Sequence, residues 1–147
     1  MVIIFTTRQN TNGKNIKSSE INNSHGTPEP VGPYSKYKKT GNLYFFSGQI
    51  GINPYTNELE KGGIKEEAIQ VCRNIKALLQ EVDLGLKDVI KTTIFLKNIN
   101  DFDIVNEVYK DYFILKPARS TVEVSNLPKG ASIEIEVIAS HDILNLK

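Results

Sequence analysis

The chain has 147 residues, of which 39% are hydrophobic, and it carries a formal net charge of +1, two histidines and one cysteine. A chain of this length folds as one domain that buries about 70% of its unfolded surface. One cysteine excludes an internal disulfide, two histidines exclude a histidine-rich metal site, and no apolar run reaches the about 20 residues of a membrane span. The composition predicts one domain in a reducing compartment, the cytoplasm, with no metal and no membrane partner.

The N-terminal part differs in composition from the rest of the chain. Residues 6–29 are rich in asparagine, serine and threonine and poor in large apolar side chains, so they bury too little surface to offset the entropy of ordering. We predict a polar, flexible extension over residues 1–29 and a single folded domain over residues 30–147. The apolar start at residues 2–5 is too short for a signal peptide. It fits an added strand, a remnant of a targeting segment or a disordered end, so location in an organelle is an alternative to the cytoplasm.

The charge is distributed unevenly along the chain. Residues 1–40 carry six basic and two acidic side chains, a net charge of +4, whereas the remainder carries twelve basic and fifteen acidic ones, a net charge of −3. Proteins that bind nucleic acid through its phosphates usually present a basic patch. The acidic body disfavours nucleic acid as a partner, although the basic N-terminal part leaves weak, salt-sensitive RNA binding open.

Regular patterning begins after the polar extension. We predict a short extra strand near residues 34–39, an apolar-rich strand over 43–50 and a turn-rich hairpin region over 51–63. Apolar residues then recur at helical spacing, which predicts an amphipathic helix over 64–83. Cys72 lies on the apolar stripe of this helix and is expected to be a small core residue.

The second half of the chain continues with a strand over 89–96 that is rich in β-branched residues. Asn100 or Asp101 can cap a second helix. The residues of this helix that are spaced to face a sheet are Phe102, Val105, Val108, Tyr109 and Tyr112. Two further strands, over 119–124 and 133–139, are joined by a Pro/Gly turn.

The order of elements defines the fold class as α+β. Two helices suffice to cover one face of a mixed sheet of five to six strands. The other face is then either solvated or covered by another chain.

The last two strands carry a notable set of charges. Alternation puts Arg119 and Thr121 on the polar side of the first strand, and Glu134 and Glu136 on the polar side of the second. We therefore expect one guanidinium and several carboxylates to share a sheet face, as a site for a small carboxylate-bearing molecule. Only three of the 18 basic residues are arginine, and its donors match a carboxylate in bidentate fashion. The alternatives are an ordinary ion pair of Arg119 with Glu123 or Glu134, and a solvated strand face.

Several short motifs lie along residues 30–141. They are Gly32-Pro33-Tyr34-Ser35, Phe46-Ser47-Gly48-Gln49-Ile50, Asn53-Pro54, Val89-Ile90-Lys91-Thr92-Thr93, Asn100-Asp101-Phe102, Pro117-Ala118-Arg119-Ser120, Leu127-Pro128-Lys129-Gly130 and Ile133-Glu134-Ile135-Glu136. In their order and spacing they resemble the motifs of the RidA family, the reactive-intermediate deaminases that are also labelled YjgF proteins, L-PSP endoribonucleases or translation inhibitors. The resemblance implies a chorismate-mutase-like fold that assembles as a homotrimer, with ligand clefts between neighbouring subunits. The N-terminal extension is longer than the lead-in that is usual in the family.

The same resemblance implies roles for individual residues. Arg119 would hold the substrate carboxylate, and Glu134 would position or activate the attacking water. Thr121 stands where many bacterial members have cysteine, which argues against a thiol nucleophile. The residues that would line the cleft are Tyr34, Ser47, Gly48, Asn106 and Thr121. From the residues alone, Tyr34 could equally close a turn, Ser47 bond to nearby backbone, and Asn106 face solvent.

The implied reaction is the hydrolytic deamination of 2-imino acids or their enamine tautomers, such as 2-iminobutanoate and 2-iminopropanoate, to 2-oxo acids and ammonia. No cofactor is required, because pyridoxal phosphate belongs to the dehydratases that release these compounds from serine and threonine. Two other classes stay open: an L-PSP-type endoribonuclease that inhibits translation, and a non-catalytic, carboxylate-binding or chaperone-like trimer. The absence of a histidine pair for acid–base work, and of an aromatic stripe beside a basic groove, disfavours the first class. The presence of both Arg119 and Glu134 favours catalysis over the second.

Overall fold

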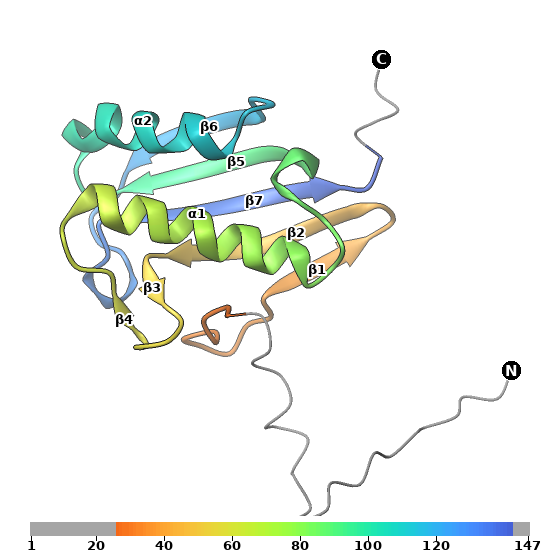
Figure 1. Ribbon diagram of the computed structural model, residues 1–147, viewed down its shortest axis with the longest axis horizontal. Helices are drawn as coiled ribbons and strands as arrows, with labels where there is room; N and C mark the ends of the chain where they lie inside the picture. The colour runs from red at the N-terminus through yellow and green to blue at the C-terminus, as the bar shows by residue number, and fades with distance from the viewer. Residues whose placement is uncertain (1–25, 143–147) are drawn as a thin grey trace, which may run out of the picture.

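The computed structural model describes residues 26–142. Figure 1 shows two helices lying across one side of a sheet. The chain runs through β1 (Tyr37–Thr40), β2 (Leu43–Ile50), β3 (Ile52–Asn53), β4 (Glu58–Leu59), α1 (Ile64–Gln80), β5 (Val89–Leu96), α2 (Phe102–Tyr112), β6 (Ala118–Glu123) and β7 (Ile133–Ser140). Short 3-10 turns occupy Leu86–Asp88, Ile99–Asp101 and Pro128–Gly130.

The main sheet has five strands in the order β1-β2-β7-β5-β6. Neighbouring strands are antiparallel except β5 and β6, which are parallel. A parallel pair needs a crossover connection, and α2 supplies it. The strands β3 and β4 form a separate two-stranded sheet, which is the predicted hairpin. The α+β prediction, with five to six strands and two helices on one face, is confirmed.

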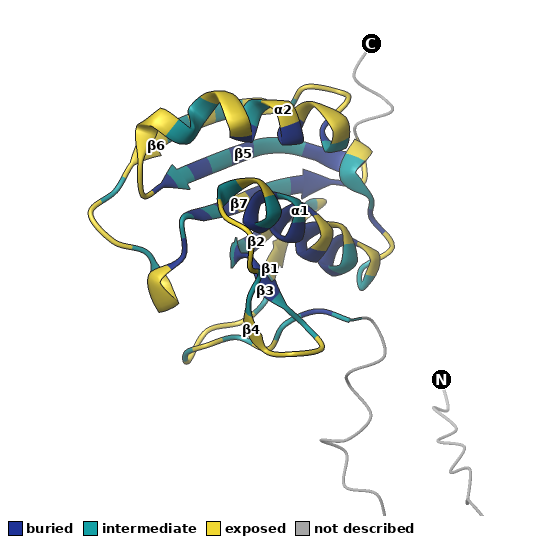
Figure 2. Ribbon diagram, turned by 60° about the vertical axis from the view of Figure 1, so that its left-hand side comes forward, coloured by how far each residue is buried: buried dark blue, intermediate teal, exposed yellow. Residues whose placement is uncertain are grey.

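The hydrophobic core lies between the sheet and the helices. Figure 2 shows that α1 and α2 bury the sides that face the sheet and expose their outer sides. Cys72 is 1% exposed within this core, as predicted, and burial raises the pKa of its thiol to about 12. The thiol is therefore protonated at every physiological pH and belongs to the packing of the core rather than to chemistry.

The predicted end of the first helix is wrong, whereas the second helix begins directly after Asp101, one of its two predicted caps. The first helix ends at Gln80 and not at residue 83, because Asp83 adopts a left-handed φ of 59° and the Leu84 N–H donates to the Leu79 carbonyl at 2.9 Å. At the start of α2, Asp101 makes no side-chain capping bond. Asn98 supplies the side-chain oxygen instead, accepting from the Asn100 N–H at 3.0 Å at the beginning of the preceding 3-10 turn.

The segment before β1 is attached to the end of α1. Residues 1–25 of the predicted extension lie outside the described residues, but Thr27 is 7% exposed. Its hydroxyl donates to the Glu81 carboxylate at 2.6 Å. The Lys36 ammonium donates to the Thr27 hydroxyl at 2.8 Å and lies 3.2 Å from the same carboxylate. These contacts fix the position of the intervening chain, which carries Tyr34.

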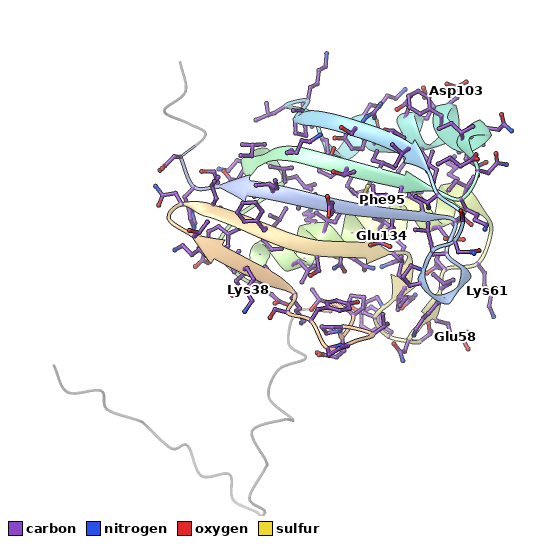
Figure 3. All side chains as sticks on the ribbon, turned by 180° about the vertical axis from the view of Figure 1, so that it is seen from behind. Lys38, Glu58, Lys61, Phe95, Asp103 and Glu134 are labelled. Carbon is purple, nitrogen blue, oxygen red and sulfur yellow. The ribbon has the colours of Figure 1, made fainter. Side chains whose placement is uncertain are left out.

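The face of the sheet away from α1 and α2 is not covered by any helix of residues 26–142 (Figure 3). It includes Phe45 and Val122, which are 42% and 44% exposed. A sheet face that leaves large apolar side chains half-exposed is a surface that another chain can cover. Neither helix of the described chain has the length and hydropathy of a membrane span.

Candidate active site

Arg119 lies on the edge strand β6, and its side chain passes under α2. One guanidinium nitrogen, Nη1, donates to the Asn106 side-chain oxygen at 2.8 Å. The guanidinium carbon lies 4.8 Å from the ring centroid of Tyr109 and 5.5 Å from that of Phe102. Such cation–π contacts each contribute about 0.5–2 kcal/mol. No carboxylate within residues 26–142 pairs with this guanidinium, so its remaining donors are available to a ligand.

The ring of Tyr109 is itself held in place. Its hydroxyl forms a 2.7 Å hydrogen bond with the buried Thr92 hydroxyl, and its ring stacks on Phe113 with centroids 4.4 Å apart. Burial raises the pKa of Tyr109, and this outweighs the opposing effects of the Thr92 bond and of Arg119. The neutral ring therefore forms a fixed support for the guanidinium.

Thr121 follows Arg119 by two residues on the same side of β6. Its Oγ1 is the only buried side-chain nitrogen or oxygen in the described part of the chain that has no hydrogen-bond partner. Such atoms are rare in folded proteins, since each costs about 1–3 kcal/mol. We call Asn106, Arg119 and Thr121, with the supporting rings, the arginine cluster. A groove of about 440 Å³ runs beside it, lined among others by Asn106, Tyr109, Phe113, Ile114, Pro117 and Arg119.

A second group of predicted residues gathers where β2 meets β7. The pairing of these strands is irregular between Phe46 and Gln49, and Ser47 and Gly48 form this bulge. The Ser47 hydroxyl donates to the Ser35 carbonyl at 2.7 Å, and its N–H donates to the Lys36 carbonyl at 3.0 Å. Bulges commonly redirect a strand beside a functional site. Here the bulge joins the Tyr34 segment to β7.

Glu134 lies directly over the backbone of Gly48. A Cβ added at Gly48 would lie 1.8 Å from Oε1 of Glu134, so any side chain there would displace the carboxylate. Glu134 has no ion-pair partner among residues 26–142. Burial raises the pKa of Glu134, and the nearby Glu136 carboxylate raises it further. A carboxylate with a raised pKa is suited to accept a proton.

Tyr34 borders the same region and is 47% exposed. Its hydroxyl accepts from the Val31 N–H at 3.3 Å. Tyr34 and Gly48 line one small hollow together with Gln49 and Lys36. We call Tyr34, Ser47, Gly48 and Glu134 the glutamate cluster.

The prediction that the guanidinium and the carboxylates share one sheet face is wrong for a single chain. Arg119 pairs with Thr92, which in turn pairs with Val137, so Arg119 lies on the helix side of the sheet. Glu134 pairs with Phe95, and Figure 3 shows both on the open side. The reason is that β6 is an edge strand whose polar side faces α2 while its valine side is exposed.

The structure thus divides the predicted site residues between two clusters. The alternative ion pairs of Arg119 are not formed, and Glu123 instead accepts from the Ile99 N–H at 2.7 Å. The contacts of Phe102 and Tyr109 with the guanidinium were not predicted. Their spacing around Asn106 on one side of α2 was the available signal. Within residues 26–142, no three His, Cys, Asp or Glu side chains lie close enough together to hold a metal ion.

Replacing Gly48 by alanine tests the contact with Glu134. For the 2-iminobutanoate hydrolysis that the family resemblance implies, we expect kcat to fall by about 10²-fold, because a displacement of about 1 Å at a reacting group has an effect of that size. Stability should change by less than about 1 kcal/mol, since the displaced carboxylate is half-buried and flexible. Steady-state kinetics and thermal unfolding measure the two effects. Gly85→Ala is the matched control, because a Cβ there would make only an ordinary contact, 3.8 Å from Asp88. Equal kinetics in the two variants would contradict the expectation.

Comparison with known proteins agrees with this fold. The family model described as Endoribonuclease L-PSP matches residues 25–141. A RutC family protein of Pyrococcus abyssi is 50% identical over 123 residues, which are 83% of this chain and 97% of that protein. The 2-iminobutanoate/2-iminopropanoate deaminase of Dermatophagoides farinae is 47% identical over 112 residues, 76% of this chain and 88% of that protein.

The crystal structure of E. coli TdcF with bound serine is 37% identical, with a TM-score of 0.75, and the match covers 80% of this chain and 94% of that one. Fold and sequence together define an α+β protein of the L-PSP type. The chain belongs to the RidA/YjgF family.

Proposed function

We propose that the protein is a 2-imino acid deaminase, which hydrolyses 2-iminobutanoate and 2-iminopropanoate to 2-oxo acids and ammonia. The observation that carries the proposal is the pair of unneutralised groups: a guanidinium with free donors at Arg119 and a half-buried carboxylate without a cation at Glu134. The D. farinae relative is named as a deaminase of these compounds, and TdcF binds serine, a small amino acid with a carboxylate.

The arrangement of the clusters supports a site that is shared between chains. Arg119 and Glu134 lie on opposite faces of the sheet, so one chain cannot present both to a small substrate. A contact between the arginine cluster of one chain and the glutamate cluster of the next uses two different surfaces. Such a head-to-tail contact forms a closed ring when successive rotations add up to a full turn. We propose a homotrimer with three such clefts, in which the half-exposed sheet face is covered.

The reaction requires two things of the protein: a group that binds the substrate carboxylate and one that accepts a proton from water. The guanidinium binds the substrate carboxylate, and a water molecule attacks carbon 2 of the protonated imine while Glu134 accepts a proton from it. The resulting tetrahedral adduct carries a hydroxyl and an amino group on carbon 2. Glu134 returns the proton to the amino nitrogen, and the C–N bond breaks to release ammonia. As the C=O bond forms, Glu134 takes up the remaining hydroxyl proton and passes it to the ammonia. The protonated imine and water thus yield the 2-oxo acid and ammonium.

The remaining residues of the two clusters bind the substrate or line the cleft. The unpartnered Thr121 hydroxyl can bind a ligand oxygen or the water, while Tyr34, Ser47, Gly48 and Asn106 form the cleft walls. No cofactor takes part in these steps. The substrate must come from a reaction that releases an unsaturated or imino product, such as that of a pyridoxal-phosphate dehydratase acting on serine or threonine.

The direct test is to generate 2-iminobutanoate in place with a threonine dehydratase and to follow ammonia and 2-oxobutanoate. We expect their release to be faster with the protein than by spontaneous hydrolysis. Release at the spontaneous rate by well-folded protein would contradict the proposal. RNA cleavage that persists through further chromatography and is lost on mutation of Arg119 would instead support the ribonuclease class.

A further inference from the structure

Glu67 is a buried carboxylate outside both clusters. It is 8% exposed and has no ion-pair partner in the part of the chain that the structure describes. It accepts two hydrogen bonds from one residue, the N–H and the hydroxyl of Ser132, both at 2.8 Å. It also lies in the first turn of α1, where the helix dipole stabilises a negative charge. A buried carboxyl group needs hydrogen-bond partners, and Ser132 supplies both of them.

Ser132 is the last residue before β7. In addition to its two bonds to Glu67, its carbonyl accepts from the Lys97 N–H at 2.9 Å. Three hydrogen bonds therefore fix the point at which β7 begins. Glu134 is the second residue of this strand, so the direction of the first strand residues sets where its carboxylate lies.

Glu67 also touches the strand beneath Glu134. A Cβ at Gly51 would lie 3.0 Å from both Cα and the carbonyl oxygen of Glu67, so the joint between β2 and β3 packs directly on this turn of α1. Ile50, which pairs with Glu134 across the sheet, is buried at this joint. Residue 67 thus contacts both segments that define the position of Glu134: its carboxylate bonds the start of β7, and its backbone packs against the end of β2, where Gly48 lies.

We propose that Glu67 is a positioning residue that holds Glu134 over Gly48, because its carboxylate ties Ser132, at the start of β7, to the turn of α1 on which the Gly51 joint packs. Its effect on turnover rests on the proposed deaminase function, but its effect on the position of the Glu134 carboxylate does not. The two can therefore be tested separately.

The kinetic test compares Glu67→Ala with Asp88→Ala. Asp88 is a matched control, because it is also 8% exposed, accepts a backbone N–H from Gly85 at 2.8 Å and directly precedes a strand. We expect both variants to be less stable. Only Glu67→Ala should lower kcat, by about tenfold or more with little change in KM. Equal kcat values in the two variants would overturn the proposal.

Two additional variants separate positioning from a general loss of structure. Glu67→Gln should recover most of the loss, since its amide can accept from the Ser132 N–H and donate to the Ser132 hydroxyl. In a Glu134→Gln background, Glu67→Ala should cause no further loss of kcat, because it acts through the missing carboxylate. Multiplicative losses would overturn the proposal.

The positional test needs no turnover. Carbon NMR of labelled glutamate follows the titration of Glu134, whose surroundings include the Glu136 carboxylate. We expect the pKa of Glu134 to fall toward its ordinary value in Glu67→Ala, as the carboxylate gains water, and to stay unchanged in Asp88→Ala. An unchanged titration in Glu67→Ala would overturn the proposal even if the protein proved not to be a deaminase. A shifted titration without deaminase activity would support Glu67 and refute only the proposed function.

Discussion

Replacing Arg119 by alanine is expected to lower kcat/KM for 2-iminobutanoate by about 10²-fold or more. A charge-assisted, bidentate bond to a carboxylate is among the stronger polar interactions, and a partly buried one costs about 2–5 kcal/mol when one partner is removed. The guanidinium makes one side-chain hydrogen bond, to Asn106, and rests on two rings. Its loss should therefore leave the fold intact, which circular dichroism and size-exclusion chromatography can verify.

Two controls make this result specific. Arg119→Lys keeps the charge but loses the planar pair of donors, so it should recover little of the activity. Arg73→Ala removes an exposed arginine on α1 that belongs to neither cluster, and it should behave as the wild type. An Arg119→Ala variant with unchanged kcat/KM would rule out the carboxylate-binding role.

Replacing Glu134 by glutamine should lower kcat by about 10²–10⁴-fold, the range that general acid–base groups contribute. Glutamine retains the size and polarity of the side chain but cannot accept the proton from water. Binding of the 2-oxo acid product should change little, because Arg119 supplies the main contact. Inhibition by 2-oxobutanoate measures this binding, and a loss of affinity that matches the loss of kcat would indicate a binding contact instead of a base.

The pH dependence follows from the same carboxylate. Burial and Glu136 raise the pKa of Glu134 above its ordinary value of 4.5. Because the base acts only when ionised, kcat/KM should fall as the pH drops through this raised pKa. Glu136→Gln removes the like charge and should shift the fall to lower pH, whereas Glu134→Gln should eliminate it. A shift to higher pH in Glu136→Gln would contradict this assignment.

Much of the fold could be predicted because it follows from periodicity. The apolar stripe of α1 gave the helix and the buried Cys72, and alternation gave the strands of the main sheet. Alternation also correctly separated Arg119 and Thr121 from Val122 within β6. It could not show which side of an edge strand faces the helices, because such a strand need not bury its apolar side. This is why the predicted common face of Arg119 and Glu134 was wrong.

The candidate site was predictable as a set of residues but not as an arrangement. The motifs identified Gly48. The reason that this position needs a glycine is the bulge in β2 and the Glu134 carboxylate that lies over it, and neither can be seen in the sequence. The rings beneath Arg119 looked like ordinary core residues, because helical spacing shows that Phe102 and Tyr109 face inward but not what they contact. No sequence pattern indicated a role for Glu67, since its partner Ser132 is 65 residues away in the chain.

We propose that each active site takes Arg119 from one chain and Glu134 from its neighbour. The most direct measurement is to refold or co-express Arg119→Ala and Glu134→Gln chains together, purify the mixed trimers by two different tags, and assay 2-iminobutanoate hydrolysis. A shared site predicts recovery of activity to roughly a third of the wild-type level, because every cyclic trimer that contains both chains has one of its three interfaces with both groups unaltered. Activity no higher than that of the separate variants, in trimers shown to contain both chains, would contradict the account.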